Sequence, residues 1–426
     1  MKNPKIILDN YKPQRPKRLS ATFFRILVFF ATIKHKVTFN YHFDKKKMKN
    51  KQVILISDHS SRDTFYYTVK GYDCVNLNYL MGYQNFFDKT LFKLFLRLGV
   101  IPKKLYAPDI KATKSILRLI KEGCSICFFP EGIQSVCGTT QPMNPASLKL
   151  LKAAKLDVIL CCSKGSYLNR PRFSKTYRYG KIEIDYYVLF TKQEVVDLTL
   201  EQMYEKYMQY FAYNDFKWNK LARNEYVGKV PNASGLEKIL FYCPKCHSQF
   251  NLYTENDKLI CRNCHNSVIV NKYYDLIKEN DETYLPYDRI DKWYLTQRKI
   301  VQEEIKDPNF TLTVKVILKE IKEKLEKDKY YKTGEGTLTI NKDGVTYIGT
   351  RFGEHYERTF SYDILISAPV EAGIGNEFYY EDEYFNFDLA ENPNLSVKIM
   401  ILIEEYHNLV DPVWKKYCED VFKVED

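Results

Sequence analysis

The sequence lacks a run of about twenty apolar residues, the length that a helix needs to cross a bilayer. Its main apolar segment near the start, residues 21–33, is shorter and contains Arg25. It also lacks a cleavable export signal and any long disordered tract, so we expect its 426 residues to form two or three folded domains. Without an export signal, the 11 cysteines, most of them outside any local pairing pattern, indicate a reducing cytoplasm.

The composition and charge favour a folded protein with an acidic partner. Apolar residues make up 45% of the chain and the net charge is +12. This charge suits a membrane surface, a phosphate-bearing substrate or a nucleic acid. The basic arm over residues 1–20, the Phe-rich segment 21–33 and the lysines of 45–49 predict, within residues 1–40 and just beyond, a helix in the interface of an anionic membrane. The alternative is a first helix packed on a sheet, and both can be true.

The stretch around His59 suggests a catalytic base. Residues 53–56 are an apolar run typical of a buried strand, and Ser57 and Asp58 end it. His59 and Asp63 are four residues apart, so on a helix they would share one face. The carboxylate could then hold the imidazole in one tautomer, leaving the other nitrogen to activate a hydroxyl. The alternative is a capped helix whose His and Asp are only solvated.

A second apolar strand, residues 124–129, ends in the turn Pro130-Glu131-Gly132. Strands that alternate with helices form a parallel α/β sheet, and ligands gather at the ends of its strands. Both motifs stand at such ends, so we expect them to share one site.

These motifs resemble the glycerolipid acyltransferase family, which joins a fatty acyl group to glycerol phosphate or lysophosphatidate. Four blocks can be compared over residues 40–190. The family's His-x-x-x-x-Asp is one residue shorter here, at His59 and Asp63. The second block, residues 98–104, has lysine where the family has arginine, and the fourth, residues 158–162, lacks its proline. The third block, residues 129–135, has Gln134 where the family has arginine.

The resemblance implies a fold and a reaction. The fold is α/β, with a mixed sheet flanked by helices over residues 41–226. The reaction moves an acyl group from a thioester, acyl-CoA or an acyl carrier protein, to a hydroxyl of a lysophospholipid. His59 would act as base and Asp63 would orient it; the implied substrate-binding residues are Lys103, Lys104, Glu131, Gly132 and Gln134. Of these, Gly132 shapes the acceptor pocket, Glu131 contacts the acceptor, and Lys103 or Lys104 binds an anionic head group. The glutamine at 134 weakens the case for an acceptor that carries a phosphate. We rank lysophosphatidate first as acceptor, and the hydroxyl of another lysolipid or a glycolipid second.

Two C-x-x-C knuckles, Cys243 with Cys246 and Cys261 with Cys264, predict a zinc ribbon over residues 237–275. Four thiolates from two knuckles close a tetrahedral shell around Zn²⁺, which makes the site structural and not catalytic. A histidine follows each knuckle, as in haem attachment, but that modification needs an exported chain. Ribbons often bind nucleic acid, yet no cluster of base-reading residues is present, so we do not expect it.

The last part of the chain predicts a helical connector over residues 276–330, including a helix at 313–329, and a β-rich domain over 331–426. Asp343-Gly344 between two β-prone runs predicts a hairpin, and residues 395–410 a helix. This order of elements resembles pleckstrin-homology and GRAM-like barrels, which would imply lipid or partner binding. The rival to the enzyme is therefore a catalytically degenerate membrane or nucleic-acid adaptor that uses the ribbon and this domain. For the enzyme we expect a cytoplasmic protein, peripheral on the inner face of the membrane.

Overall fold

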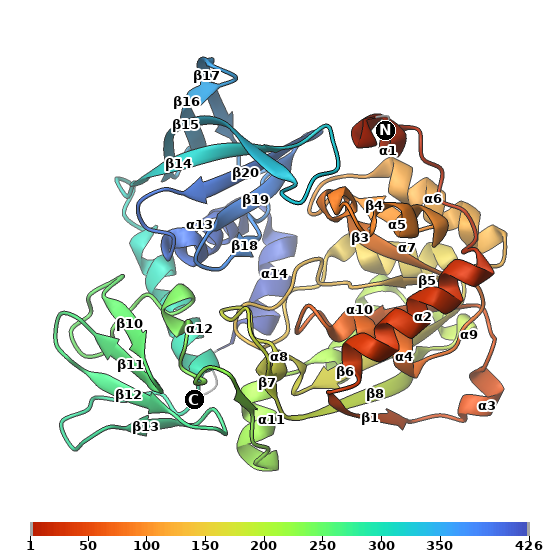
Figure 1. Ribbon diagram of the computed structural model, residues 1–426, viewed down its shortest axis with the longest axis horizontal. Helices are drawn as coiled ribbons and strands as arrows, with labels where there is room; N and C mark the ends of the chain where they lie inside the picture. The colour runs from red at the N-terminus through yellow and green to blue at the C-terminus, as the bar shows by residue number, and fades with distance from the viewer. Residues whose placement is uncertain (1–2, 424–426) are drawn as a thin grey trace.

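The computed structural model describes residues 3–423, and its first half is built on a mixed seven-stranded sheet (Figure 1). In spatial order the strands are β1 (Lys36–Tyr41), β8 (Lys181–Phe190), β6 (Asp157–Lys164), β2 (Val53–Ser57), β5 (Ser125–Phe128), β3 (Leu77–Gly82) and β4 (Ile101–Lys103). The five strands from β6 to β4 run parallel, and β1 runs parallel to β8. The two groups meet where β8 pairs antiparallel with β6.

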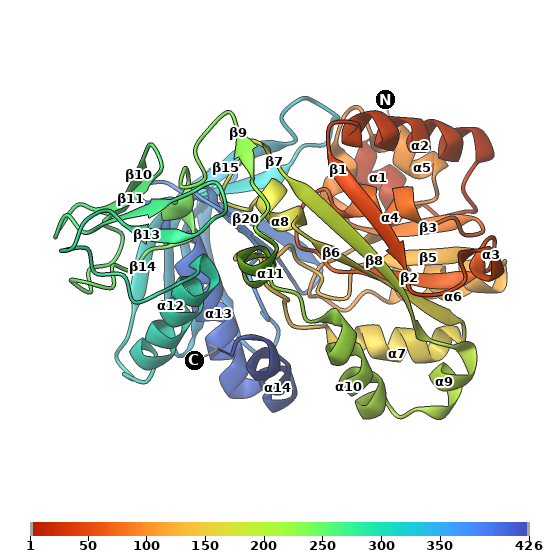
Figure 2. The same cartoon turned by 90° about the horizontal axis from the view of Figure 1, so that it is seen from below.

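Helices bury both faces of this sheet, and the central strand β2 shows why. Alternate side chains of a strand point to opposite faces, and all five residues of β2 are buried. Val53 and Leu55 pack in one apolar cluster with α2 and α4, while Ile54 and Ile56 pack in another with α6, α7 and α10 (Figure 2). The helices of this half are α1 (Pro4–Asp9), α2 (Arg18–Thr32), α3 (Lys45–Met48), α4 (Thr64–Gly71), α5 (Phe92–Arg97), α6 (Ile110–Lys121), α7 (Pro145–Ala154), α8 (Ser166–Asn169), α9 (Lys192–Asp197), α10 (Leu200–Phe211) and α11 (Asp215–Ala222), with a 3₁₀ turn η1 (Tyr83–Phe87).

The predicted ribbon forms a separate four-stranded antiparallel sheet. Its strands are β10 (Leu252–Glu255), β11 (Lys258–Cys261), β12 (Ser267–Val270) and β13 (Leu276–Lys278). It is joined to the first half through a short pair, β7 (Arg178–Tyr179) with β9 (Val227–Gly228), and a 3₁₀ turn, η2 (Leu236–Lys238).

A second seven-stranded sheet, antiparallel throughout, forms the C-terminal part. Its order is β17 (Glu354–Phe360), β16 (Gly344–Arg351), β15 (Tyr330–Asn341), β14 (Leu312–Ile321), β20 (Glu383–Leu389), β19 (Gly375–Tyr380) and β18 (Val370–Glu371). Three helices accompany it: α12 (Ile290–Glu304), α13 (Leu395–Val410) and α14 (Pro412–Val421).

The sequence prediction of a helix at 313–329 is wrong, so the segment 276–330 is not a purely helical connector. Residues 312–321 form β14, the central strand of the C-terminal sheet. Val314, Val316 and Leu318 are two residues apart and all buried, while Lys315 between them is exposed. This period of two, made largely by β-branched residues, is the pattern of a strand and outweighs the helical spacing of the same apolar residues.

Two other predictions for this part are confirmed. β15 and β16 form the hairpin, with Asn341 paired to Gly344 across its turn, and α13 spans 395–410. In the described residues β17 and β18 do not pair with each other, although Phe360 of β17 contacts Phe378 of β19 at a centroid distance of 5.0 Å. The likeness to pleckstrin-homology and GRAM-like barrels stays a prediction.

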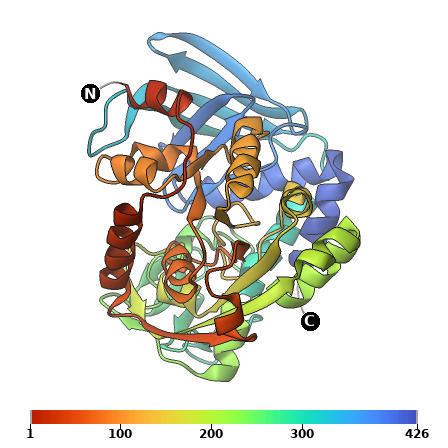
Figure 3. The ribbon, with the colours of Figure 1, turned by 90° about the vertical axis from the view of Figure 1, so that its right-hand side faces the viewer.

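The two halves are in contact through α14, which Figure 1 shows between the C-terminal sheet and the first sheet. Trp414 of α14 contacts the ring of Tyr106, and Tyr417 contacts Tyr204 of α10, at centroid distances of 6.0 and 4.1 Å. α2 lies on the outside of the molecule in Figures 2 and 3. No helix within residues 3–423 combines the length and the apolar character that crossing a bilayer requires.

Candidate active site

The two sequence motifs meet because β2 and β5 are parallel neighbours, with Ile56 opposite Phe128 in the register. Glu131, after β5, accepts a hydrogen bond from the backbone N–H of His59, after β2, at 2.7 Å. In return the backbone N–H of Ser135 donates to the carbonyl of His59 at 2.9 Å. The backbone N–H and the backbone carbonyl of His59 are thus both bound by residues 129–135.

The His59 imidazole is half-buried and stacks on the ring of Phe129, with centroids 4.7 Å apart. Burial, and next the positive charge of Arg172, lower its pKa from 6.5 to about 4; the backbone of Ser61 acts weakly in the other direction. A histidine with this pKa is neutral at pH 7, and a neutral imidazole is the form that can accept a proton.

The predicted orientation of His59 by Asp63 is not observed. Residues 59–63 are not helical; α4 begins at Thr64 with Asp63 as its N-cap, so the two side chains do not share a helix face. Asp63 Oδ1 instead accepts a hydrogen bond from Arg170 at 2.9 Å. Nδ1 of His59 and Oδ2 of Asp63 are both buried, and neither has a hydrogen-bond partner in the described residues.

The contact of Glu131 with an acceptor, which the resemblance implied, stays a prediction, and its carboxylate has partners within the protein. It is fully buried, and besides His59 it accepts the backbone N–H of Gln141 at 2.9 Å. Burial raises its pKa well above the usual value, which these two backbone N–H groups oppose. Glu131 therefore links the loop after β2 to the loop after β5 and positions the His59 backbone.

Asp58 is a second buried carboxylate, which in the sequence only marks the end of an apolar strand. It accepts hydrogen bonds from the backbone N–H and the hydroxyl of Ser163, at 2.7 and 2.6 Å, and from the N–H of Ser60 at 3.1 Å. Ser163 lies on β6, so Asp58 ties together the ends of β2 and β6 under His59. An aspartate that directly follows an apolar strand was the available sequence signal.

Gly132 stands where the chain turns sharply after Glu131. Its φ of 76° lies in the left-handed region that favours glycine. Tyr106 donates a hydrogen bond to the carbonyl of Glu131 at 2.9 Å, and a Cβ added at residue 132 would lie 3.7 Å from the Tyr106 ring. The role of Gly132 in shaping an acceptor pocket stays a prediction.

Arg172 lies against Gln134, the position at which the resembling motif has arginine. Its Nη1 donates to Oε1 of Gln134 at 2.7 Å, and its Nη2 donates to the backbone carbonyl of Val370. Arg170 and Arg172 were both missed in the sequence analysis. The signal for them was the pair of arginines around Pro171, shortly after the strand that ends at residue 164.

Lys103 and Lys104 lie away from His59. They belong to β4 and its end, three strands from β2 or about 14 Å at the usual strand spacing. The amine of Lys103 donates to the carbonyls of Lys104 and Ala107, and Lys104 pairs with Asp382 at 2.5 Å. Lys104 lines a cavity of about 520 Å³ between α6, the N-terminal arm and the β19–β20 turn. Their role in head-group binding stays a prediction.

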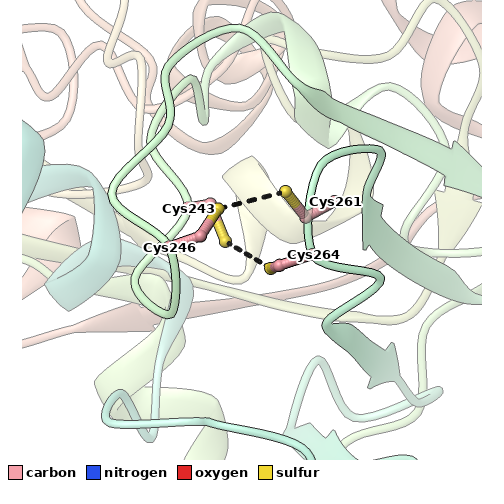
Figure 4. A group of neighbouring side chains, drawn as sticks. All are labelled: Cys243, Cys246, Cys261 and Cys264. Carbon is pink, nitrogen blue, oxygen red and sulfur yellow. Dashed lines mark hydrogen bonds between the residues drawn. The ribbon is translucent and has the colours of Figure 1, made fainter.

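The four cysteines of the ribbon converge from its two knuckles (Figure 4). Their sulfur atoms all lie within 4.8 Å of one another, with Cys243 to Cys264 and Cys246 to Cys261 at 3.7 Å. Zinc–sulfur bonds of about 2.3 Å in a tetrahedron place sulfur atoms about 3.8 Å apart, so the cluster fits Zn²⁺. Four protein ligands leave no open position, which makes such a site structural.

Comparison with known proteins gives a coarse likeness to a solved structure. No family model matches the sequence, and no curated protein matches it. Among solved structures, the chain is similar to the 1-acyl-sn-glycerophosphate (LPA) acyltransferase PlsC from Thermotoga maritima, with 14% sequence identity and a TM-score of 0.33. The match covers 43% of this chain and 75% of that one. The likeness is one of coarse fold, so the chemistry of the site has to be judged from its own geometry.

Proposed function

We propose that this protein transfers an acyl group from a thioester to a hydroxyl, with His59 as general base. The observation that carries the proposal is that residues 129–135 contact His59 on its backbone and on its ring. Glu131, Ser135 and Phe129 fix its backbone and ring at the ends of β2 and β5. A neutral imidazole held in this way at the edge of a parallel sheet can activate an acceptor.

In the proposed reaction His59 accepts the proton of the acceptor hydroxyl while its oxygen attacks the thioester carbonyl carbon. The carbon–sulfur bond then breaks, and the leaving thiolate takes the proton from the imidazolium. The products are an ester and a free thiol, with His59 restored, so no covalent acyl-enzyme is needed. Glu131 is a positioning residue for His59 in this scheme.

For the substrates we propose a lysophospholipid acceptor, 1-acylglycerol-3-phosphate first, and acyl-CoA or an acyl carrier protein as donor, in phospholipid synthesis. The net charge of +12 supports anionic substrates and an anionic membrane surface. The exposed apolar side chains of α2 support a peripheral place on the membrane, at the inner, cytoplasmic face.

A catalytically degenerate membrane or nucleic-acid adaptor is the second candidate. The observation that favours it is the missing hydrogen bond between His59 and Asp63. Catalytic hydrogen bonds often tighten only when a substrate binds. The missing bond therefore does not outweigh the contacts that residues 129–135 make with His59.

The test is acyl transfer from labelled palmitoyl-CoA by the purified zinc-loaded protein, with a panel of lysolipid acceptors. His59→Ala should lower kcat by about 10²-fold or more, the usual contribution of a general base. His355→Ala removes an exposed histidine on β17 and should leave the rate unchanged. No product with any acceptor, from either acyl-CoA or an acyl carrier protein donor, would favour the adaptor, and so would a His59→Ala protein that retains its activity.

A further inference from the structure

The guanidinium of Arg172, whose charge acts on His59, lies beside Gln134. Arg172 comes from the segment between α8 and β7, 38 residues further along the chain. One Nη donates to Gln134 at 2.7 Å, and the other donates to Val370 of the C-terminal sheet. The two halves of the molecule therefore meet at this arginine.

Two hydrogen-bond donors at this point are buried without a partner in residues 3–423. They are Nε of Arg172 and Nε2 of Gln134, and Gln134 as a residue is only 8% exposed. Buried donors in folded proteins are nearly always satisfied, by protein or by a bound group. Two such donors on touching side chains point to an anionic or strongly accepting ligand.

A second arginine adds positive charge to the same place. Arg62, three residues after His59, forms an ion pair with Glu371 of β18 at 3.6 Å. Arg172 contacts Val370 and Arg62 contacts Glu371, two adjacent residues of β18, so the two guanidinium groups lie close together. In keeping with this, burial and next the charge of Arg62 lower the pKa of Arg172 to about 10, while Glu371 and Glu377 oppose the shift. The side chains of Arg62 and Glu371 are 49% and 52% exposed, and a long ion pair at such exposure is weak.

We propose that Arg172 and Arg62 bind the phosphate of the acyl acceptor, and that Glu371 pairs with Arg62 until that phosphate replaces it. The C-terminal sheet thereby forms part of the acceptor site. The inference rests on the proposed acyl transfer. Guanidinium groups match phosphate in a bidentate way, and Arg172 would supply the charge that glutamine at 134 lacks.

Equilibrium binding tests the phosphate site without depending on catalysis. The ligands are 1-oleoyl-lysophosphatidate, the matching monoacylglycerol and glycerol 3-phosphate, measured by calorimetry on the full-length zinc-loaded protein. Lysophosphatidate should bind at least about tenfold more tightly than the monoacylglycerol, since charge-assisted hydrogen bonds distinguish them. Equal affinities would overturn the proposal. Glycerol 3-phosphate that binds as tightly as lysophosphatidate would keep the phosphate site and make the small phosphate the acceptor.

Matched variants assign the binding to these residues. Arg62→Gln, in an exposed position, and Arg172→Gln should each weaken lysophosphatidate binding about tenfold and leave the monoacylglycerol unaffected. Glu371→Gln should tighten it several-fold, whereas Glu391→Gln, which removes the carboxylate of an exposed ion pair with Lys315 in the same sheet, should have no effect. Unchanged binding in Arg62→Gln would refute the arginine site, and unchanged binding in Glu371→Gln would refute the role of Glu371.

Kinetics separate this proposal from the proposed function. In an active protein, Arg62→Gln should raise KM for lysophosphatidate about tenfold, with kcat and the KM for palmitoyl-CoA little changed. A rise in the donor KM alone would show that the arginines bind phosphates of coenzyme A and would overturn the assignment. A protein that binds lysophosphatidate through Arg62 and transfers no acyl group would refute the proposed function and leave the phosphate site standing.

Discussion

Glu131 is a single buried carboxylate that links two loops of the candidate active site through backbone hydrogen bonds. Both of its oxygens accept backbone N–H groups, from His59 and Gln141. Burying a carboxylate is costly, and two well-aligned donors offset much of that cost. Because one of these donors is the backbone N–H of His59, this hydrogen bond also helps to position the imidazole.

The lowered pKa of His59 gives a prediction for the pH dependence of the reaction. A general base works only when it is unprotonated, and the pKa of about 4 keeps His59 neutral well below its ordinary value of 6.5. We expect the acid limb of kcat/KM, measured from pH 4 to 8.5, to lie below pH 5.5. Arg172→Gln should move this limb to higher pH, because the arginine charge helps to lower the pKa.

Arg262→Gln, an exposed arginine in the ribbon, is the control and should leave the limb in place. An acid limb between pH 6 and 7 in the unaltered protein would contradict the prediction.

The lowered pKa of His59 also makes the stability of the fold depend on pH. As pH falls from about 6.5 toward 4, the unfolded chain takes up a proton on this histidine that the folded chain does not, so His59 makes the fold less stable over that range.

At the scale of single elements, α2 has two apolar sides. Phe24 and Val28 are buried against α4 and the sheet, as a packed first helix requires. The outer side also carries large apolar side chains, with Phe23, Ile26 and Phe30 exposed by 53, 48 and 64%. The buried side of α2 agrees with a helix packed on the sheet, and its exposed apolar side would suit a membrane interface.

We predict that Phe23→Ser, Ile26→Ser and Phe30→Ser together weaken binding to vesicles of phosphatidylglycerol and phosphatidylethanolamine about a hundredfold. Each side chain would contribute about 1 kcal/mol if roughly half of it leaves water. Because these side chains are exposed, Tm should hardly change. Vesicle co-sedimentation measures the binding, with Leu221→Ser, an exposed apolar residue of α11, as control. Equal binding by the triple variant and the unaltered protein would place the membrane contact elsewhere.

At the scale of the whole molecule, the ribbon is part of the core and not an appendage. One apolar cluster continues from the ribbon through α12 and α13 into the C-terminal sheet, and it includes Tyr167 and Phe216 of the first half. On α12, Trp293 donates to the carbonyl of Tyr242, next to the first knuckle, at 2.8 Å. Loss of the ribbon fold should therefore loosen the C-terminal part that contacts the candidate active site.

Removal of zinc tests this view. We expect one Zn²⁺ per chain and a drop in Tm of about 10 °C or more after chelation, because structural zinc contributes several kcal/mol to folding. Cys243→Ser should give the same loss of zinc and of stability. Cys74→Ser, outside the ribbon, should keep the zinc. Calorimetry measures Tm before and after chelation. An unchanged Tm would show that the ribbon does not depend on the metal.

The sequence by itself determined the features that depend on neighbouring residues. The apolar strands before His59 and before Pro130, the hairpin at Asp343-Gly344, the helix over 395–410 and the two knuckles all follow from local period, turn chemistry and ligand spacing. Each of these signals is contained in a short continuous segment of the chain, so no knowledge of the fold is needed to recognise it.

Only the tertiary structure decided which polar groups meet. Asp63 pairs with Arg170, Arg172 reaches Gln134, and Glu131 binds the backbone of His59, across 107, 38 and 72 residues of sequence. The physical reason is that strand order and loop geometry set these partners, while a charge or an amide accepts any suitable partner that the fold brings within reach. The spacing of His59 and Asp63 allowed a pair on a helix, but the loop after β2 and a nearer guanidinium gave Asp63 a different one.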